Sequence, residues 1–360
     1  MAIQVKKTEI MSQKASRCCM KVSTVLVFLL LLQAGKAQYN FSGLDSKLSQ
    51  YQKQLGGNVA TLIYKNGAII YNKSLGDFTA TTPAPIASCS KWLTAALVMQ
   101  FVDEGKLSLD DYVSKYLPIF KDYGKGYITI RQCLSHTTGI EGDPIGLAGF
   151  IKLSRYKSLA DEVDDFAAKH NIQDNPGVAF RYSTIGLNIA ARVLEVISKR
   201  PFDKLMLEKM FRPLNMKNSS FTTEFERAVN PSGGCRSTAM DYMNFLSMLL
   251  NKGMFNGKRI LSENAINTMQ QAITKPAMIK YTPPSAKGYD YALGEWVLAT
   301  DEKGKSTIVS SPGLFGTWPY IDIVRGYAAI FFVKNLEIEQ RQPMYTDLRN
   351  EIEQQILPLN

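Results

Sequence analysis

The sequence predicts an α/β fold of the α+β type. One antiparallel sheet forms from both ends of the chain, flanked by helices and interrupted by a mainly helical insertion. Strand-like segments lie at 58–71 and 292–333, and mostly helical segments lie between them. Hydrophobic residues make up 45% of the 360 residues, which is enough for a full core. We expect the sheet to use about 55–105 and 285–360, with the insertion at about 106–284.

The first sheet segment is predicted to be a hairpin. Residues 58–64 and 68–71 are rich in β-branched, aromatic and other apolar side chains, and the Asn66-Gly67 pair lies between them. An Asn-Gly pair favours a tight hairpin turn because both residues tolerate a positive φ. We therefore expect two adjacent antiparallel strands here.

Helices and further strands follow in order. Residues 90–104 are apolar on nearly every face, which is typical of a buried helix, and Gly105 ends it. Apolar periodicity and turn residues predict the remaining elements, which are helices at 185–198 and 241–251, strands at 292–299, 306–310 and 327–333, and a final amphipathic helix at about 345–356.

The first 37 residues are expected to be a signal peptide, followed by one hydrolase domain at 38–360. Lysines and arginines precede an apolar run, 25–32, that is too short to span a bilayer comfortably. Gly35 and Ala37 then give the small-x-small pattern of a cleavage site. We expect export to the periplasm or the medium of a bacterium. The alternative is an uncleaved membrane anchor.

Charge, cysteine and histidine usage exclude several classes of protein. The formal charge is +10, and the first 37 residues hold six Lys/Arg and one Glu, so the rest of the chain carries +5. That charge shows no clustered stripe, and we expect no nucleic-acid partner. Cys89, Cys133 and Cys235 are too widely spaced for a disulfide framework and are expected to be buried free thiols. His136 and His170 lack metal-ligand spacing, so we expect no metal or cofactor.

The pattern Ser-x-x-Lys occurs twice, at Ser88/Lys91 and at Ser154/Lys157. Only the first copy opens a buried helix, where residues three apart share a face. A serine hydroxyl needs a base to become a nucleophile, and burial lowers the pKa of a lysine so that its amine can serve. The helix N-terminus also directs N–H groups toward charge that develops nearby. The alternative is an N-capping serine beside a solvated lysine.

Two later segments have compositions that suit the same chemistry. Tyr182 lies just before the helix expected at 185–198, where its hydroxyl could act as a second base beside a lysine ammonium. The alternative is a packing tyrosine. Residues 310–316 end a strand with small side chains that would let backbone pass close to a substrate. The alternative there is a plain loop at a strand end.

Together these segments resemble the penicillin-recognising serine hydrolases, which include class C β-lactamases, D-alanyl-D-alanine carboxypeptidases and related esterases. The order Ser-x-x-Lys, Tyr-x-Asn, Lys/His-x-Gly is the order seen here. The resemblance runs from Asn58 to Val333, with further similar segments at 128–139, 177–183 and 232–241. It implies a β-lactamase/transpeptidase-like fold.

The resemblance also implies roles for individual residues. Ser88 corresponds to the acylated nucleophile, and Lys91 and Tyr182 to the pair that moves protons. The backbone N–H groups of Ser88 and Leu314 correspond to the oxyanion hole. His136 lies in a segment that is structural in the family, which argues against a Ser-His-Asp triad.

Three substrate-binding positions are implied, and two of them depart from the family pattern. Gly313 matches the pattern. Thr184 stands where Asn is usual, and it lacks the amide that would orient Lys91 and a substrate carbonyl. Ser311 stands where Lys or His is usual, and it lacks the cation that would meet a substrate carboxylate. Acylation chemistry is kept, while the class of substrate is left open.

We therefore expect a monomeric exported hydrolase that forms an acyl-enzyme on Ser88 and cleaves an amide or ester bond. Its substrate would be a small molecule or a peptide, for example a cell-wall fragment, and a carboxypeptidase or esterase is favoured over an efficient β-lactamase. A membrane contact is expected only if the signal stays uncleaved. The alternative is a weak or inactive receptor of cell-wall fragments or β-lactams on the same fold.

Overall fold

The computed structural model describes residues 39–142, 156–221, 227–335 and 341–359. The expected signal peptide, 1–37, lies outside these residues. The chain divides into two units, 1–40 and 41–360, and the second is described here. Among the described residues, no helix combines the length and the apolar character that crossing a membrane requires.

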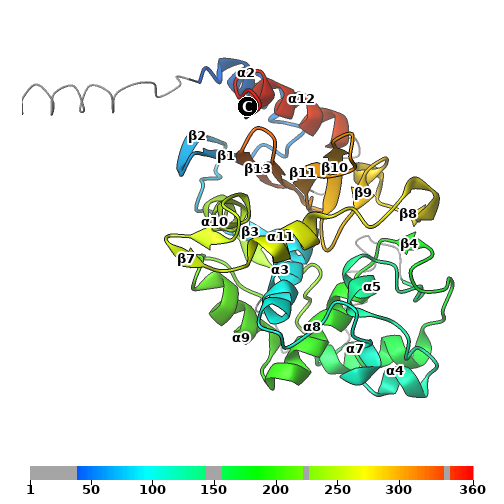
Figure 1. Cartoon of the computed structure of the whole chain (residues 1–360). Helices are drawn as coiled ribbons and strands as arrows, with labels where there is room; N and C mark the ends of the chain where they lie inside the picture. Colours follow the sequence, from blue (N-terminus) through cyan, green and yellow to red (C-terminus); the bar gives the residue numbers. More distant parts are fainter. Residues whose placement is uncertain (1–38, 143–155, 222–226, 336–340, 360) are drawn as a thin grey trace, which may run out of the picture. The chain divides into compact units, whose positions relative to one another are not determined.

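The centre of this unit is a seven-stranded sheet in the order β2-β1-β13-β12-β11-β10-β9, in which every neighbouring pair is antiparallel. Its strands are β1 (Val59–Lys65), β2 (Ala68–Leu75), β9 (Asp290–Tyr291), β10 (Trp296–Thr300), β11 (Ser306–Ser310), β12 (Gly316–Asp322) and β13 (Tyr327–Lys334). β1 pairs with β13, so the two ends of the chain meet inside one sheet (Figure 1). This confirms the predicted fold class.

Three two-stranded pairs lie outside the main sheet in the described residues. They are β3 (Ala84–Pro85) with β5 (Arg236–Ser237), β4 (Phe180–Arg181) with β8 (Ile279–Tyr281), and β6 (Met254–Phe255) with β7 (Lys258–Arg259). The first two pairs tie the segments that precede Ser88 and Tyr182 to distant parts of the chain.

One central strand, β12, was not predicted from the sequence. Pro319 lies within it, and proline cannot donate to a sheet ladder. The ladder with β11 ends at the pair Ser310 and Tyr320, one residue before Pro319. Pro319 therefore needs no N–H for that ladder, and its carbonyl accepts from the Ser310 hydroxyl at 2.6 Å. The strand expected at 292–299 begins only at Trp296, because the preceding residues form a turn.

Helices cover both faces of the sheet and make up most of the chain between the strands of its two ends. They are α2 (Ser42–Tyr51), α3 (Ser90–Asp103), α4 (Ile119–Asp122), α5 (Ile130–Leu134), α7 (Leu159–Lys169), α8 (Ile185–Ser198), α9 (Phe202–Met206), α10 (Ala239–Leu250), α11 (Glu263–Gln270) and α12 (Arg341–Glu353). The shorter helical turns are η1 (Ala87–Cys89), η2 (Val113–Lys115), the π-turn η3 (Leu207–Phe211), η4 (Pro276–Met278) and η5 (Pro284–Ala286).

Figure 1 shows α2 and α12 on one face of the sheet and α3, α10 and α11 on the other. On the first face, the Tyr345 ring of α12 stacks on Trp318 of β12 at 4.7 Å. On the second face, α3 lies between the sheet and the helical region and packs against α8 and α11. Residues 106–284 hold helices α4 to α11, while 41–360 forms one unit, so the domain boundaries given above stay a prediction.

Candidate active site

Ser88 lies in η1, the turn that leads into α3. The residue before it, Ala87, has φ +45°, a left-handed conformation that costs energy for a residue with a Cβ. Hydrogen bonds hold this turn: Ser90 Oγ donates to the Ala87 carbonyl at 2.6 Å and accepts from the Cys235 N–H at 3.1 Å. Tyr242 Oη donates to the Cys89 carbonyl at 2.8 Å. The turn is therefore fixed by groups from two other segments.

Lys91 follows one helical turn later and contacts Ser88 directly. Its Nζ lies 3.2 Å from Ser88 Oγ and 2.9 Å from the carbonyl oxygen of Ser232. The side chain is 1% exposed, and burial lowers the pKa of Lys91 to about 7. About half of an amine with this pKa is unprotonated at pH 7 and free to accept a proton, because desolvation disfavours its ammonium form.

Tyr182 lies between β4 and α8 and packs over the lysine. Its ring centroid is 4.8 Å from Lys91 Nζ, and its side chain is buried. Burial raises the pKa of Tyr182 above the usual value of 10, and a hydrogen bond with Ser88 opposes the rise only in part. Desolvation outweighs the effect of the neighbouring groups here. Tyr182 is therefore a phenol at neutral pH and can pass on a proton.

His136 and two aromatic rings, those of Tyr291 and Trp296, lie around Tyr182. The His136 ring centroid lies 4.6 Å from that of Tyr182, and Trp296 lies at 5.1 Å. His136 Nδ1 faces the N–H of Ser183 at 3.4 Å and its Nε2 contacts Tyr291 Oη at 3.1 Å. These contacts fit a neutral ring with the proton on Nε2. Burial, aided by the Lys91 charge, holds the pKa of His136 well below 6.5. His136 thus positions Tyr182 and carries no charge itself.

The loop between β11 and β12 lies against the nucleophile turn. Ser311 Oγ donates to the backbone carbonyl of Ser88 at 3.2 Å. A Cβ on Gly313 would lie 2.3 Å from the carbonyl oxygen of Ile86, so only glycine fits at this position. No acceptor for the backbone N–H of Ser88 or Leu314 is found among the described residues. These two donors are therefore available to a bound oxyanion.

Thr184 lies at the N-cap of α8, partly exposed, and its side chain makes no capping hydrogen bond. Lys91 is oriented by the Ser232 carbonyl, a contact that the side-chain motifs of the sequence do not reveal. The structure thus brings Ser88, Lys91, Tyr182 and Ser311 into contact with one another, whereas no hydrogen bond links Thr184 to Lys91 in the described part of the chain.

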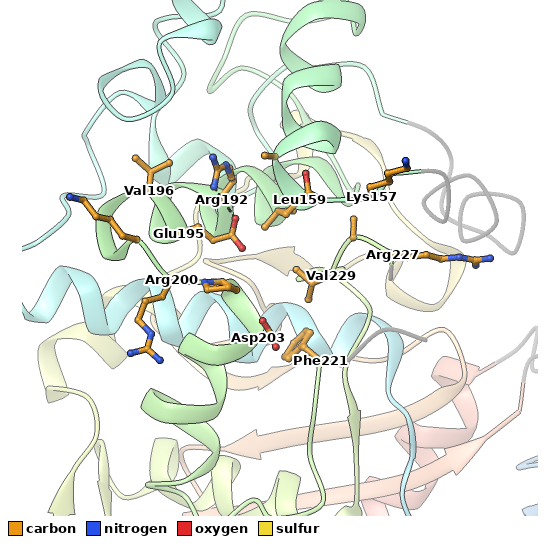
Figure 2. Close-up of a pocket in the computed structure, with 15 residues that line it drawn as sticks. Lys157, Leu159, Arg192, Glu195, Val196, Arg200, Asp203, Phe221, Arg227 and Val229 are labelled. Atoms are coloured by element: carbon orange, nitrogen blue, oxygen red, sulfur yellow. Dashed lines mark hydrogen bonds and ion pairs between the residues drawn. The ribbon is translucent and has the colours of Figure 1, made fainter. Parts of the chain in front are cut away.

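The lysine of the second Ser-x-x-Lys copy lies away from the candidate catalytic residues. Ser154 lies outside the described residues, and Lys157 lines a cavity of about 730 Å³ between α7, α8 and α9. Figure 2 shows Lys157 at its rim with Arg192, Glu195 and other charged side chains. None of the candidate catalytic residues lines this cavity. Lys91, by contrast, contacts Ser88 inside the core.

The cysteines of the described residues lie in the core. Cys89, Cys133 and Cys235 are buried free thiols, as expected, and burial raises the pKa of each. Within the described ranges, no group of three or more His, Cys, Asp or Glu side chains is arranged to hold a metal ion.

Comparison with known proteins defines the family. A family model described as Beta-lactamase matches residues 44–352. The chain belongs to the Beta-lactamase family. A solved structure from Bacteroides dorei DSM 17855, provisionally named a beta-lactamase, is 32% identical with a TM-score of 0.74, covering 82% of this chain and 91% of that one.

Other Beta-lactamase family members and neighbours carry hydrolase or penicillin-binding names. PbpX of Bacillus subtilis (strain 168), provisionally named a penicillin-binding protein, is 27% identical over 221 residues, which are 58% of this chain and 54% of PbpX. The chain thus spans about half the length of PbpX. EstCE1, described as a hydrolase with promiscuous acyltransferase activity, shares the fold with a TM-score of 0.72 at 19% identity, covering 86% of this chain and 97% of EstCE1.

Proposed function

We propose that this chain is a serine hydrolase that cleaves an amide or ester bond through an acyl-enzyme on Ser88. The observation that carries the proposal is the buried Lys91 amine, with a pKa of about 7, at 3.2 Å from Ser88 Oγ. A base of this pKa is well matched to proton transfer at neutral pH. The family and its hydrolase neighbours support the same class of activity.

The proposed reaction has two halves. In the first, Lys91 accepts the Ser88 proton while Oγ bonds to the substrate carbonyl carbon, and the N–H groups of Ser88 and Leu314 bind the oxyanion. The oxyanion collapses, the bond to the leaving group breaks, Tyr182 delivers its proton to that group, and the proton held by Lys91 passes to Tyr182. In the second half, water gives up a proton to Lys91 as its oxygen bonds to the acyl carbon. The bond from that carbon to Ser88 Oγ then breaks, and Oγ takes the proton back from Lys91, which restores both groups.

A mass measurement tests this proposal. The purified chain is incubated with a fluorophosphonate, a penicillin and a small ester, and its intact mass is recorded. We expect an adduct in wild type that is absent in Ser88→Ala. Ser154→Ala is the matched control, because it removes the serine of the other Ser-x-x-Lys copy. An adduct that persists in Ser88→Ala, or is lost in a folded Ser154→Ala, would contradict the assignment of Ser88.

The substrate is proposed to be a small molecule or peptide that does not depend on a free carboxylate. Ser311 presents a neutral hydroxyl bonded to the Ser88 carbonyl, where relatives carry Lys or His. Hydrogen bonds to charged groups contribute about 1.5–3 kcal/mol, so losing the cation weakens the preference for carboxylate-bearing substrates. Arg236 of β5 pairs with Pro85, three residues before Ser88. Its guanidinium is a cation that could bind a substrate carboxylate in place of the missing Lys or His.

A weak or inactive receptor of cell-wall fragments or β-lactams is the second candidate. Thr184 and Ser311 favour it, because the amide and the cation of the family pattern are both missing. Slow acylation without turnover in the mass experiment would select this candidate.

We also propose export with cleavage after Ala37. N-terminal sequencing of the protein from the producing cells would test this, and an uncleaved N-terminus would contradict it.

A further inference from the structure

Two side chains of α12 bond to backbone carbonyls of the loop between β11 and β12. The Arg341 guanidinium donates to the carbonyl of Gly313 at 3.0 Å, to that of Leu314, and to that of Asn335 at 3.0 Å. Four residues later on the helix, Tyr345 Oη donates to the carbonyl of Gly316. Backbone groups add to this hold, because the Gly316 N–H donates to the Gly313 carbonyl at 3.0 Å and the Asn335 N–H to the Phe315 carbonyl at 2.7 Å.

Arg341 acts on the peptide unit that contains the proposed oxyanion donor. The Gly313 carbonyl and the Leu314 N–H belong to the same planar unit, and no cis peptide occurs in the described residues. In a trans peptide the C=O and N–H point in opposite directions. A guanidinium that fixes the Gly313 oxygen therefore also fixes the direction of the Leu314 N–H.

The charge of Arg341 also strengthens that N–H as a donor. A cation on the carbonyl oxygen polarises the peptide, and chains of hydrogen bonds reinforce one another where solvent is excluded. Arg341 is 6% exposed, so water screens its charge little. Preorganised donors aimed at a developing oxyanion are among the largest contributions to catalysis.

On its other side, the same peptide unit packs closely against the turn that contains Ser88. A Cβ on Gly313 would lie 2.3 Å from the Ile86 oxygen and 3.2 Å from Cys89 Sγ. Ile86 and Cys89 flank Ser88, so a displacement of the loop changes the position of the Leu314 N–H relative to the nucleophile. The loop lies in contact with both α12 and η1.

We propose that Arg341 is a positioning residue that holds the Gly313–Leu314 peptide so that the Leu314 N–H faces the oxyanion formed at Ser88. The inference rests on the proposed function for its catalytic consequence. Its structural half, the ordering of the Leu314 amide by Arg341, stands on the hydrogen bonds alone.

The test compares Arg341→Lys, Arg341→Met and Arg259→Met in the full chain. Lys keeps the charge without the planar fork, and Met keeps much of the apolar stem without donors. Arg259 is the matched control, because its guanidinium also donates to two backbone carbonyls, those of Lys252 and Leu261, both at 3.0 Å. Each variant is assayed for kcat and KM on a small ester, for thermal stability, and for the NMR chemical shift of the Leu314 backbone amide.

We expect kcat to fall roughly 10-fold in Arg341→Lys and roughly 100-fold in Arg341→Met, since losing one oxyanion donor costs about 10²–10³. KM should stay within about twofold, because the contact acts on the transition state. The Leu314 amide chemical shift should change in both variants, because the planar guanidinium no longer polarises the Gly313 carbonyl. Arg259→Met should leave kcat and the Leu314 amide shift unchanged.

Unchanged kcat in Arg341→Met would overturn the inference, and so would a fall in kcat that merely follows a loss of stability. If Arg341→Met does not fold, Arg341→Lys carries the comparison. If wild type hydrolyses no ester and forms no adduct, the proposed function fails. The Leu314 amide shift then decides the structural half: an unchanged shift in Arg341→Lys overturns it, and a changed shift supports it.

Discussion

Replacing Lys91 with methionine should make the protein more stable at neutral pH and nearly inactive. Burial lowers the pKa of this amine from 10.5 to about 7. Between these two values the unfolded chain binds a proton that the folded chain does not, so stability rises with pH by up to about 1.36 kcal/mol per pH unit. At pH 7 this pKa shift lowers the free energy of unfolding of the wild type by on the order of 4 kcal/mol, and a neutral side chain would remove that penalty.

The methionine variant leaves the Ser232 carbonyl without its donor, which costs about 1–3 kcal/mol. The net expectation at pH 7 is a gain in unfolding free energy of about 1–3 kcal/mol. Acylation should fall by roughly 10²–10⁴, the usual contribution of a general base. Wild-type acylation should also rise with pH through about 7, as the amine loses its proton.

The assay is urea unfolding at pH 6, 7, 8 and 9, together with acylation rates on a small ester. The pH slope of stability between 7 and 9 should shrink in Lys91→Met by the contribution of this one amine. Lys125→Met is the matched control: Lys125 is also buried, its Nζ donates to the Ala167 carbonyl and burial lowers its pKa, but it has no contact with Ser88. A Lys91→Met variant that keeps the wild-type pH slope, or acylates at the wild-type rate, would refute the reasoning.

Four further outcomes are expected. Tyr182→Phe removes one oxygen and should slow turnover by roughly 10²–10⁴ while the melting temperature changes little; an unchanged kcat would exclude the proton-transfer role. Gly313→Ala places a Cβ 2.3 Å from the Ile86 oxygen, so kcat should fall at least 10-fold beyond any stability loss of about 1–3 kcal/mol; ordinary ester kinetics would contradict this. Burial raises the pKa of Glu295 well above 4.5, so above pH 4.5 the folded chain keeps a proton that the unfolded chain loses, and stability falls with pH by up to about 1.36 kcal/mol per unit; Glu295→Gln should remove that slope in urea unfolding, and an unaltered slope would show the carboxyl to be ionised. Ser311→His should raise kcat/KM for a carboxylate-bearing ester relative to its neutral analogue by about 10- to 100-fold, since a charged hydrogen bond contributes about 1.5–3 kcal/mol; a wild type that already prefers the carboxylate about 100-fold would show that another cation serves.

The order of the motifs and the periodicity of the chain were enough to predict much of this molecule. The Asn66-Gly67 turn specifies its hairpin locally, and the buried helix after Ser88 follows from a run that is apolar on every face. Such features depend on neighbours within a few residues, so they can be read without the tertiary structure. The strand that contains Pro319 could not be predicted in this way, because a strand accepts proline only where the neighbouring strand needs no N–H from it, and this depends on where the ladder with β11 ends.

The resemblance of the motifs to a known family implied that Ser88, Lys91, Tyr182 and the loop 311–314 form one site, an assignment that the proposed experiments address. Spacing could place Lys91 on the face of Ser88, because helical geometry is local. It could not supply the degree of burial, on which the pKa values of Lys91 and Tyr182 depend. The apolar run after Ser88 already separated the two Ser-x-x-Lys copies, and the structure adds that Lys157 lines a cavity away from the candidate catalytic residues.

What only the tertiary structure decided is the set of contacts between segments far apart in sequence. The Ser232 carbonyl that orients Lys91 and the Arg341 guanidinium that holds the Gly313 peptide are such contacts. A backbone carbonyl is present at every residue, and an arginine near a chain end has no periodic signature. Their roles arise only when distant segments meet, since electrostatic and hydrogen-bonding effects depend on distance and burial in space, whereas sequence patterns report short-range order.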